Sequence, residues 1–115
     1  MFVENMTNIK STPVNAPAVL NVLRQTLVGP EQGWDGWVMR LFTVGPAGHT
    51  PRHTHPWPHI NFIVSGKGRL FLDGQEHEVG SGYVAYIPGG AEHQFRNAGT
   101  EDFALICIVP EEGDK

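Results

Sequence analysis

Three of the six histidines lie within seven residues, and their spacing suits metal binding. His53 and His55 are separated by one residue, so on an extended strand both imidazoles would point to the same side. Their Cα atoms would then be about 6.6 Å apart, which lets both rings bind one ion. The pattern predicts a site in which imidazole nitrogens bind a metal ion.

His59 is too far along the chain to join this site on a straight strand. Four extended residues would place it roughly 13 Å beyond His55. The intervening Pro56-Trp57-Pro58 favours a bend, because each proline fixes φ and removes a backbone donor. We therefore expect His59 to bind the same ion. The alternative is that the three histidines are unrelated surface residues.

Short apolar and β-branched segments alternate with turns along the chain. Fourteen glycines and nine prolines in 115 residues favour many tight turns, and Asp73-Gly74 favours a two-residue hairpin. No segment shows a sustained helical period with caps. The predicted strands are residues 19–28, 37–44, 52–55, 59–65, 69–72, 75–79, 83–87, 94–97 and 103–109. This spacing is typical of an all-β sandwich or barrel.

The composition indicates one soluble domain. A hydrophobic content of 40% with 17% charged residues fits a globular chain, in which residues 1–18 form an extended N-terminal segment and residues 19–115 the barrel. The net charge of -4 argues against nucleic-acid binding. Neither a membrane-spanning apolar run nor a signal peptide is visible. The single cysteine, Cys107, fits a reducing cytoplasm.

Two motifs resemble those of the cupin superfamily. The first is a glycine, a His-x-His pair, a fourth ligand and a second glycine, here Gly48, His53, His55, His59 and Gly66. The second is a glycine, a Pro-x-Gly turn, a histidine and an asparagine, here Gly82, Pro88-Gly89-Gly90, His93 and Asn97. The resemblance implies an all-β fold, the jelly-roll barrel that is also called the double-stranded β-helix.

The resemblance also implies the ligands of the metal. His93 would be a ligand, and His59 occupies the position where most cupins carry glutamate. This departure resembles small single-domain cupins with a four-histidine site. That subgroup implies one divalent transition metal ion, with Mn or Fe favoured and Ni, Zn, Cu or Co also suited to imidazole ligands. It further implies a homodimer and oxidative activity.

Several residues are expected to line a substrate pocket beside the metal. By strand alternation, Asn61 and Ile63 face the same side as His59. The candidate pocket residues are Arg40, Trp57, Asn61, Ile63, Phe95, Leu105 and Cys107. Alternatively, Arg40 faces solvent over a buried stem, Cys107 is a small core residue and Trp57 is a packed aromatic. No residue is singled out as a general acid or base.

These patterns favour a metal-dependent, dioxygenase-like oxidoreductase that acts on a small organic molecule. Four histidines would leave two positions open on an octahedral ion, and the ligand run contains no inward carboxylate for proton transfer. The alternatives are a non-catalytic binding or sensor module and a closed structural zinc site. The substrate is not predicted.

Overall fold

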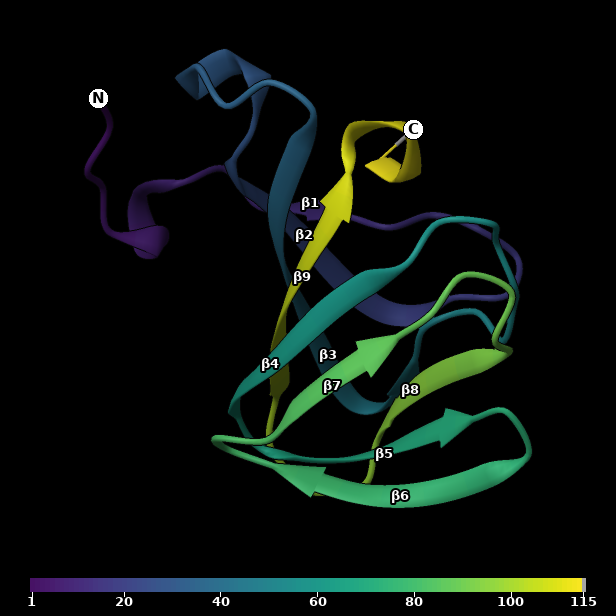
Figure 1. Ribbon diagram of the computed structural model, residues 1–115. Coiled ribbons are helices and arrows are strands. Elements are labelled where there is room, and N and C mark those ends of the chain that lie inside the picture. Colours follow the sequence, from purple (N-terminus) through teal and green to yellow (C-terminus); the bar gives the residue numbers. More distant parts are fainter. Residues whose placement is uncertain (115) are drawn as a thin grey trace.

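The computed structural model describes residues 1–114 and consists almost entirely of β-strands (Figure 1). The strands are β1 (Thr12–Pro13), β2 (Leu20–Val28), β3 (Trp37–His49), β4 (His59–Ser65), β5 (Lys67–Leu72), β6 (Gln75–Gly80), β7 (Val84–Ile87), β8 (His93–Asn97) and β9 (Phe103–Pro110). Three short 3-10 helices are η1 (Met6–Asn8), η2 (Pro30–Gln32) and η3 (Glu111–Asp114). The prediction of an all-β protein is confirmed.

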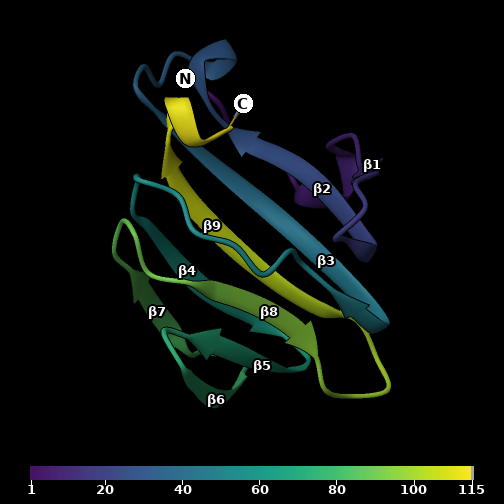
Figure 2. The same cartoon turned by 90° about the vertical axis from the view of Figure 1, so that its right-hand side faces the viewer.

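The strands form one curled antiparallel sheet. Its order is β6-β5-β8-β3-β9-β4-β7, with β2 paired to β3 and β1 to β2. The long strand β3 joins two groups, because it pairs with β9 along most of its length and reaches β8 only through His49. Figure 2 shows β2, β3 and β9 running side by side above the smaller group of β5, β6 and β8. This arrangement is the jelly-roll barrel that the sequence motifs implied.

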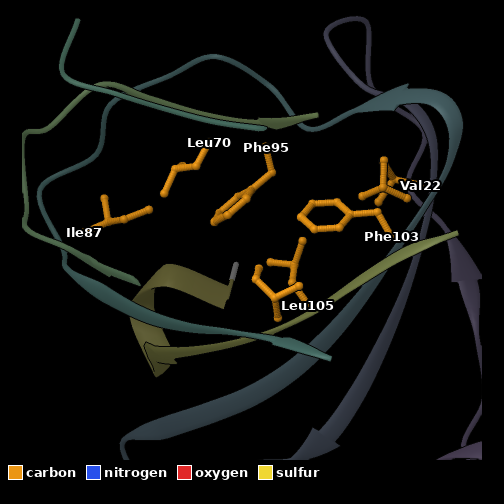
Figure 3. Packing of buried hydrophobic residues seen from close by; sticks show 8 residues of the cluster. Val22, Leu70, Ile87, Phe95, Phe103 and Leu105 are labelled. Atoms are coloured by element: carbon orange, nitrogen blue, oxygen red, sulfur yellow. The ribbon is translucent and has the colours of Figure 1, made fainter. Parts of the chain in front are cut away.

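The hydrophobic core lies between the two groups of strands. Seven strands contribute to one cluster of buried side chains, Val22, Val44, Ile63, Leu70, Ile87, Phe95, Phe103 and Leu105 (Figure 3). The Phe95 and Phe103 rings lie 6.3 Å apart, centroid to centroid. Gly68 of β5 lies directly against the Phe103 ring, where a Cβ atom would approach within 2.3 Å of the ring. The barrel is therefore filled by side chains at this end.

Strand β3 is longer than the sequence predicted. The segment 45–48 was expected to end the strand at Val44, but β3 continues to His49. The register of β2 against β3 shifts between Val22↔Val44 and Leu20↔His49, so the extra residues form a bulge. Ala47 in this bulge has a φ of 65°. The glycines and the proline of segment 45–48 therefore bend β3 without ending it.

The predicted strand at residues 52–55 is absent. The chain makes a single bridge there, between His53 and His93. Pro51 and Pro56 flank the segment, and since neither has a backbone N–H to donate, the ladder cannot extend in either direction.

The N-terminal segment lies against the sheet. Thr12 and Pro13 pair with Arg24 and Leu23 of β2, and the Gln25 side chain donates to the carbonyl oxygens of Met6 and Ile9. Its residues also line the cavity described below. Within residues 1–114, no helix has the length and apolar character needed to cross a membrane.

Candidate metal centre

Reciprocal backbone hydrogen bonds hold two of the predicted ligands side by side. The His53 amide donates to the His93 carbonyl at 3.1 Å, and the His93 amide donates to the His53 carbonyl at 3.0 Å. His53 belongs to the first motif and His93 to the second, forty residues later. This pairing brings the two motifs together at one end of the barrel.

The loop before β8 is fastened to the first motif by a close backbone approach. A Cβ atom on Gly89 would lie 2.2 Å from the Pro56 carbonyl oxygen, so only glycine fits at this contact. The Gly90 amide donates to the His55 carbonyl at 2.8 Å, and Gly90 has a φ of 84°. The Pro-x-Gly motif therefore positions His55 as well as His93.

Three histidines form a compact group with metal-binding spacing. The ligand nitrogens of His53, His55 and His93 all lie within 4.8 Å of one another. His59 adjoins this group, since its Nε2 atom is 3.2 Å from Nε2 of His93 and its ring centroid is 5.2 Å from that of His55. The bend at Pro56-Trp57-Pro58 returns the chain so that β4 begins at His59.

Hydrogen bonds at Nδ1 determine which nitrogen each ring presents. Nδ1 of His55 lies 2.7 Å from the Trp57 carbonyl oxygen, Nδ1 of His93 lies 2.9 Å from the Ala91 carbonyl oxygen, and Nδ1 of His59 lies 2.7 Å from Oδ1 of Asn61. Because each partner accepts, each Nδ1 carries the proton, and a neutral ring then has an unprotonated Nε2. Two such lone pairs 3.2 Å apart, on His59 and His93, repel unless a cation lies between the rings. The donor set therefore fits a transition metal ion.

Burial keeps these imidazoles neutral. Burial, and next the charge of His93, lowers the pKa of His59 to about 3. Burial, followed by the charges of His93, His55 and Arg40, lowers the pKa of His53 to about 4. Burial also lowers the pKa of His93. At neutral pH the rings of His53, His59 and His93 are therefore unprotonated and ready to bind metal without first losing a proton.

A cavity of about 1110 Å³ opens beside the histidines. It lies between the barrel strands, the segment 50–57 and the N-terminal segment, and all four histidines line it. Its apolar wall includes Phe42, Phe95 and Leu105. The volume is that of a site for a substantial organic molecule.

The structure places most of the predicted pocket residues on this cavity. The lining includes Arg40, Trp57, Asn61, Phe95, Leu105 and Cys107. Ile63 instead lies in the hydrophobic cluster, with 1% of its surface exposed. Trp57 packs face to face on the His55 ring, with centroids 4.8 Å apart and planes 11° from parallel. Trp57 therefore orients the His55 ring as well as lining the cavity.

Two partly buried charged residues of the cavity were not found from the sequence. Arg24 of β2 and Asp114 of η3 both line it and form an ion pair. Arg24 lies in a strand without histidines, and Asp114 is in the Glu-Glu-Gly-Asp ending that the sequence analysis did not assign to the site. The available signal for Arg24 was strand alternation, since Arg24 shares a face of β2 with Val22 and Thr26, which also line the cavity. For Asp114 no local pattern gave one.

We predict that the metal-free protein loses stability as the pH falls from about 6.5 to about 4. Above the ordinary histidine pKa of about 6.5, both folded and unfolded chains are neutral at these rings. Below it, the histidines of the unfolded chain bind protons, whereas in the folded chain His53 binds a proton only near pH 4 and His59 only near pH 3. Unfolding is therefore favoured as the pH falls. Each excess proton steepens the slope by about 1.4 kcal/mol per pH unit. Urea unfolding at several pH values measures it.

A variant pair checks the origin of that slope. His59→Leu should flatten the dependence, whereas His77→Ala, in the exposed strand β6, should leave it unchanged. Equal slopes in wild type and His59→Leu would show that the histidine group does not cause it.

We predict that Asn61→Leu weakens metal binding by about 10- to 100-fold, as losses of a ligand's hydrogen-bond partner commonly do. The change removes the acceptor for His59 Nδ1, so the ring loses its fixed tautomer and orientation. A competitive chelator titration measures the affinity. Ile63→Val is the matched control on the same face of β4, since it reduces core packing but touches no ligand. An unchanged affinity in Asn61→Leu would contradict this role.

Two of the proteins to which this chain is similar bear the names of enzymes that act on different substrates. The chain is 34% identical over 77 residues to a 1-methylthio-D-xylulose 5-phosphate methylsulfurylase of Rhodospirillum rubrum, a match that covers 67% of this chain and 49% of the relative. It is 33% identical over 78 residues to the dimethylsulfoniopropionate lyase DddW of Ruegeria pomeroyi, covering 67% of this chain and 51% of the relative. The chain thus spans about half the length of these relatives.

A solved structure resembles nearly the whole chain. The polyketide cyclase RemF from Streptomyces resistomycificus superimposes with a TM-score of 0.89 at 29% sequence identity, over 96% of this chain and 79% of that chain. The family model described as Cupin domain matches residues 40–109, which include all four histidines. With the barrel topology and the two fastened motifs, this match shows that the chain belongs to the cupin family.

Proposed function

We propose that this cupin is a metal-dependent enzyme in which His53, His55, His59 and His93 hold one divalent transition metal ion. We further propose that the adjoining cavity binds an oxygen-rich organic molecule that undergoes ring closure, a reaction of the polyketide-cyclase kind. The observation that carries the proposal is the group of histidine ring nitrogens gathered beside a large cavity, with Nε2 of His59 facing Nε2 of His93. The similarity to a polyketide cyclase over 96% of the chain supports the reaction class.

Each part of the cavity would have a separate task in such a reaction. A bound divalent ion would act as a Lewis acid toward a carbonyl oxygen of the substrate. Asn61, Trp57 and the Ala91 carbonyl keep the imidazoles oriented. Phe42, Phe95 and Leu105 provide an apolar wall that excludes water and holds a flexible substrate folded.

Dioxygenase-like oxidation, which the sequence analysis favoured, is the second candidate. Its support is the neutral imidazole set, which suits redox-active Mn and Fe as well as Zn. The sequence argument for it relied on the lack of an inward carboxylate. The ligand run from His53 to Asn61 carries no carboxylate, and Asp114, which also lines the cavity, is paired with Arg24. A non-catalytic binding module is the remaining alternative.

We predict that reconstituted protein closes rings on poly-β-carbonyl substrates without consuming oxygen. Protein purified without added nickel is analysed for bound metal, stripped, and reloaded with Zn, Mn or Fe. Turnover is followed by mass spectrometry beside an oxygen electrode. Because a Lewis acid needs no redox change, the Zn form should be active and aerobic and anaerobic rates should agree.

Other results would select other functions. Oxygen uptake in step with turnover, confined to the Mn or Fe form, would support the dioxygenase reading. Tight metal retention without turnover of any substrate would support a binding module. His59→Ala and His59→Glu test the fourth ligand, with His77→Ala as the control, and His59→Ala should lower metal affinity at least about tenfold.

We also propose that the protein is a homodimer. The outer face of β4 and β7 exposes Ile60, Phe62, Val84 and Tyr86, with Ile60 opposite Tyr86 and Phe62 opposite Val84. Apolar residues gathered in this way commonly mark an interface. Strand β2, where the sequence suggested an exchange between protomers, pairs with β1 and β3 of its own chain.

Light scattering after size-exclusion chromatography measures the mass of the assembly. We predict a dimer for the wild type and a monomer for Phe62→Asp, because the change buries a charge in the interface. Glu76→Lys, on the exposed strand β6, should remain dimeric. A wild-type monomer at micromolar concentration would contradict the proposal.

A further inference from the structure

Arg40 points into the barrel, toward the metal centre. On β3 it is paired with Cys107 of β9, and Cys107 is in turn paired with Asn61 of β4. Strands in a sheet lie about 4.8 Å apart, so the backbones of Arg40 and Asn61 are separated by roughly 10 Å. The Arg40 side chain extends across this row, because its Nη2 atom lies 3.0 Å from Cys107 Sγ. Arg40 lies at one end of this row of three residues, and Asn61, which is hydrogen-bonded to His59, lies at the other. Arg40 and the histidines therefore face the same cavity from opposite sides.

The Arg40 guanidinium is largely buried with little to balance its charge. The side chain is 14% exposed, and its hydrogen-bond partner within residues 1–114 is a thiol, a weak acceptor. The nearest carboxylate contact, from Nη1 to Asp114, is 3.7 Å. Nε of Arg40 is buried and has no hydrogen-bond partner among the described residues. A buried cation with unsatisfied donors is costly unless a further acceptor binds to it.

The cavity carries an excess of one positive charge among its less exposed groups. Asp114 forms a close ion pair with Arg24, whose Nε is also buried without a partner. Two guanidinium groups and one carboxylate leave a net charge of +1. The other charged side chains of the lining, Glu4, Lys10 and Glu31, are exposed, where water and salt screen them.

Apolar walls surround this charge. The centroid of the Phe42 ring lies 4.9 Å from the Arg40 guanidinium carbon. Phe42 is two residues along β3 from Arg40 and pairs with Leu105 of β9. Val14, Val22 and Leu27 complete the apolar lining near the N-terminal segment. A ligand that fills such a space has an apolar body with one anionic group, and a monoanion matches the single excess charge better than a phosphate dianion.

From these observations we propose that the cavity binds an amphiphilic organic carboxylate, whose anionic group is held by the fork of Arg40 donors while its body lies against Phe42 and Leu105. Arg40 is then the residue that selects anionic substrates. This inference deepens the proposed function, because the same molecule would present its other oxygen atoms to the metal centre. The planar guanidinium suits a carboxylate, since it can donate two parallel hydrogen bonds.

Isothermal titration calorimetry on the metal-free protein tests this directly. The probes are 2-naphthoate, its neutral counterpart 2-naphthamide, and inorganic phosphate. We expect naphthoate to bind at least about tenfold more tightly than the amide, the effect of one charge-assisted hydrogen bond, and phosphate to bind more weakly than naphthoate. Equal affinity for acid and amide, preference for phosphate, or no naphthoate binding at millimolar concentration would overturn the proposal.

Variants assign the effect to Arg40. Arg40→Gln should lose the preference for the acid over the amide, and Arg40→Lys should retain only part of it, because lysine keeps the charge without the fork. Arg69→Gln, at an exposed arginine of β5 outside the cavity, should behave as wild type. If Arg40→Gln does not fold, the comparison of acid with amide on the wild type still decides the proposal.

The test is independent of the metal. Naphthoate binding that depends on Arg40 in protein unable to retain metal would support this inference and contradict the proposed enzyme. Metal retention in both wild type and Arg40→Gln, with equal binding of acid and amide, would contradict this inference and leave the metal centre intact.

Discussion

The structure depends on the crowding of imidazole lone pairs at one end of the barrel. His55, His59 and His93 each donate from Nδ1 to a fixed acceptor, so their Nε2 atoms face inward, and two of these atoms are 3.2 Å apart. Protonation cannot relieve the repulsion at neutral pH, because burial lowers the pKa of His59 and His93. One metal ion bound among the rings would give these nitrogens a common partner. The acceptors that set the tautomers are therefore as necessary as the ligands.

Several independent contacts fix the backbone that produces this crowding. His53 and His93 exchange two hydrogen bonds, and the Gly89-Gly90 turn packs on Pro56 and binds His55. These contacts join segments far apart in the sequence. Pro51 and Pro56 prevent residues 52–55 from becoming part of a regular strand. Asn97, the last residue of the second motif, donates to the carbonyl oxygens of Val44 and Glu101 and so holds the loop that follows β8. The two motifs thus encode one rigid arrangement of the backbone around the histidines.

The sequence predicted the all-β fold class and the closeness of His53 to His55 because these depend on local spacing. The bend before His59 and the shared face of Asn61 and Ile63 in β4 follow from backbone geometry. The strand expected at residues 52–55 is absent, and the bridge between His53 and His93 holds that segment instead. The length of β3 was mispredicted, because a bulge opposite Asn21 and Leu20 keeps the segment 45–48 extended. Arg24 and Asp114 were not found, since they meet only when β2 and η3 are brought together by the sheet. Both the length of β3 and the meeting of Arg24 with Asp114 depend on pairing between residues far apart in the sequence, which a local sequence pattern does not show.

The division of the barrel into a filled end and a hollow end explains how a chain of 115 residues keeps both stability and a large cavity. Phe95, Phe103 and Leu105 fill one end, and Phe95 and Leu105 also form the floor of the cavity, so the same side chains contribute to both. The hollow end gives up apolar burial and gathers histidines and arginines, which are costly to bury without partners. That cost falls when a cation binds the imidazoles and an anion binds the guanidinium. A metal ion and an anionic ligand would thus stabilise the end of the barrel that lacks a core of its own.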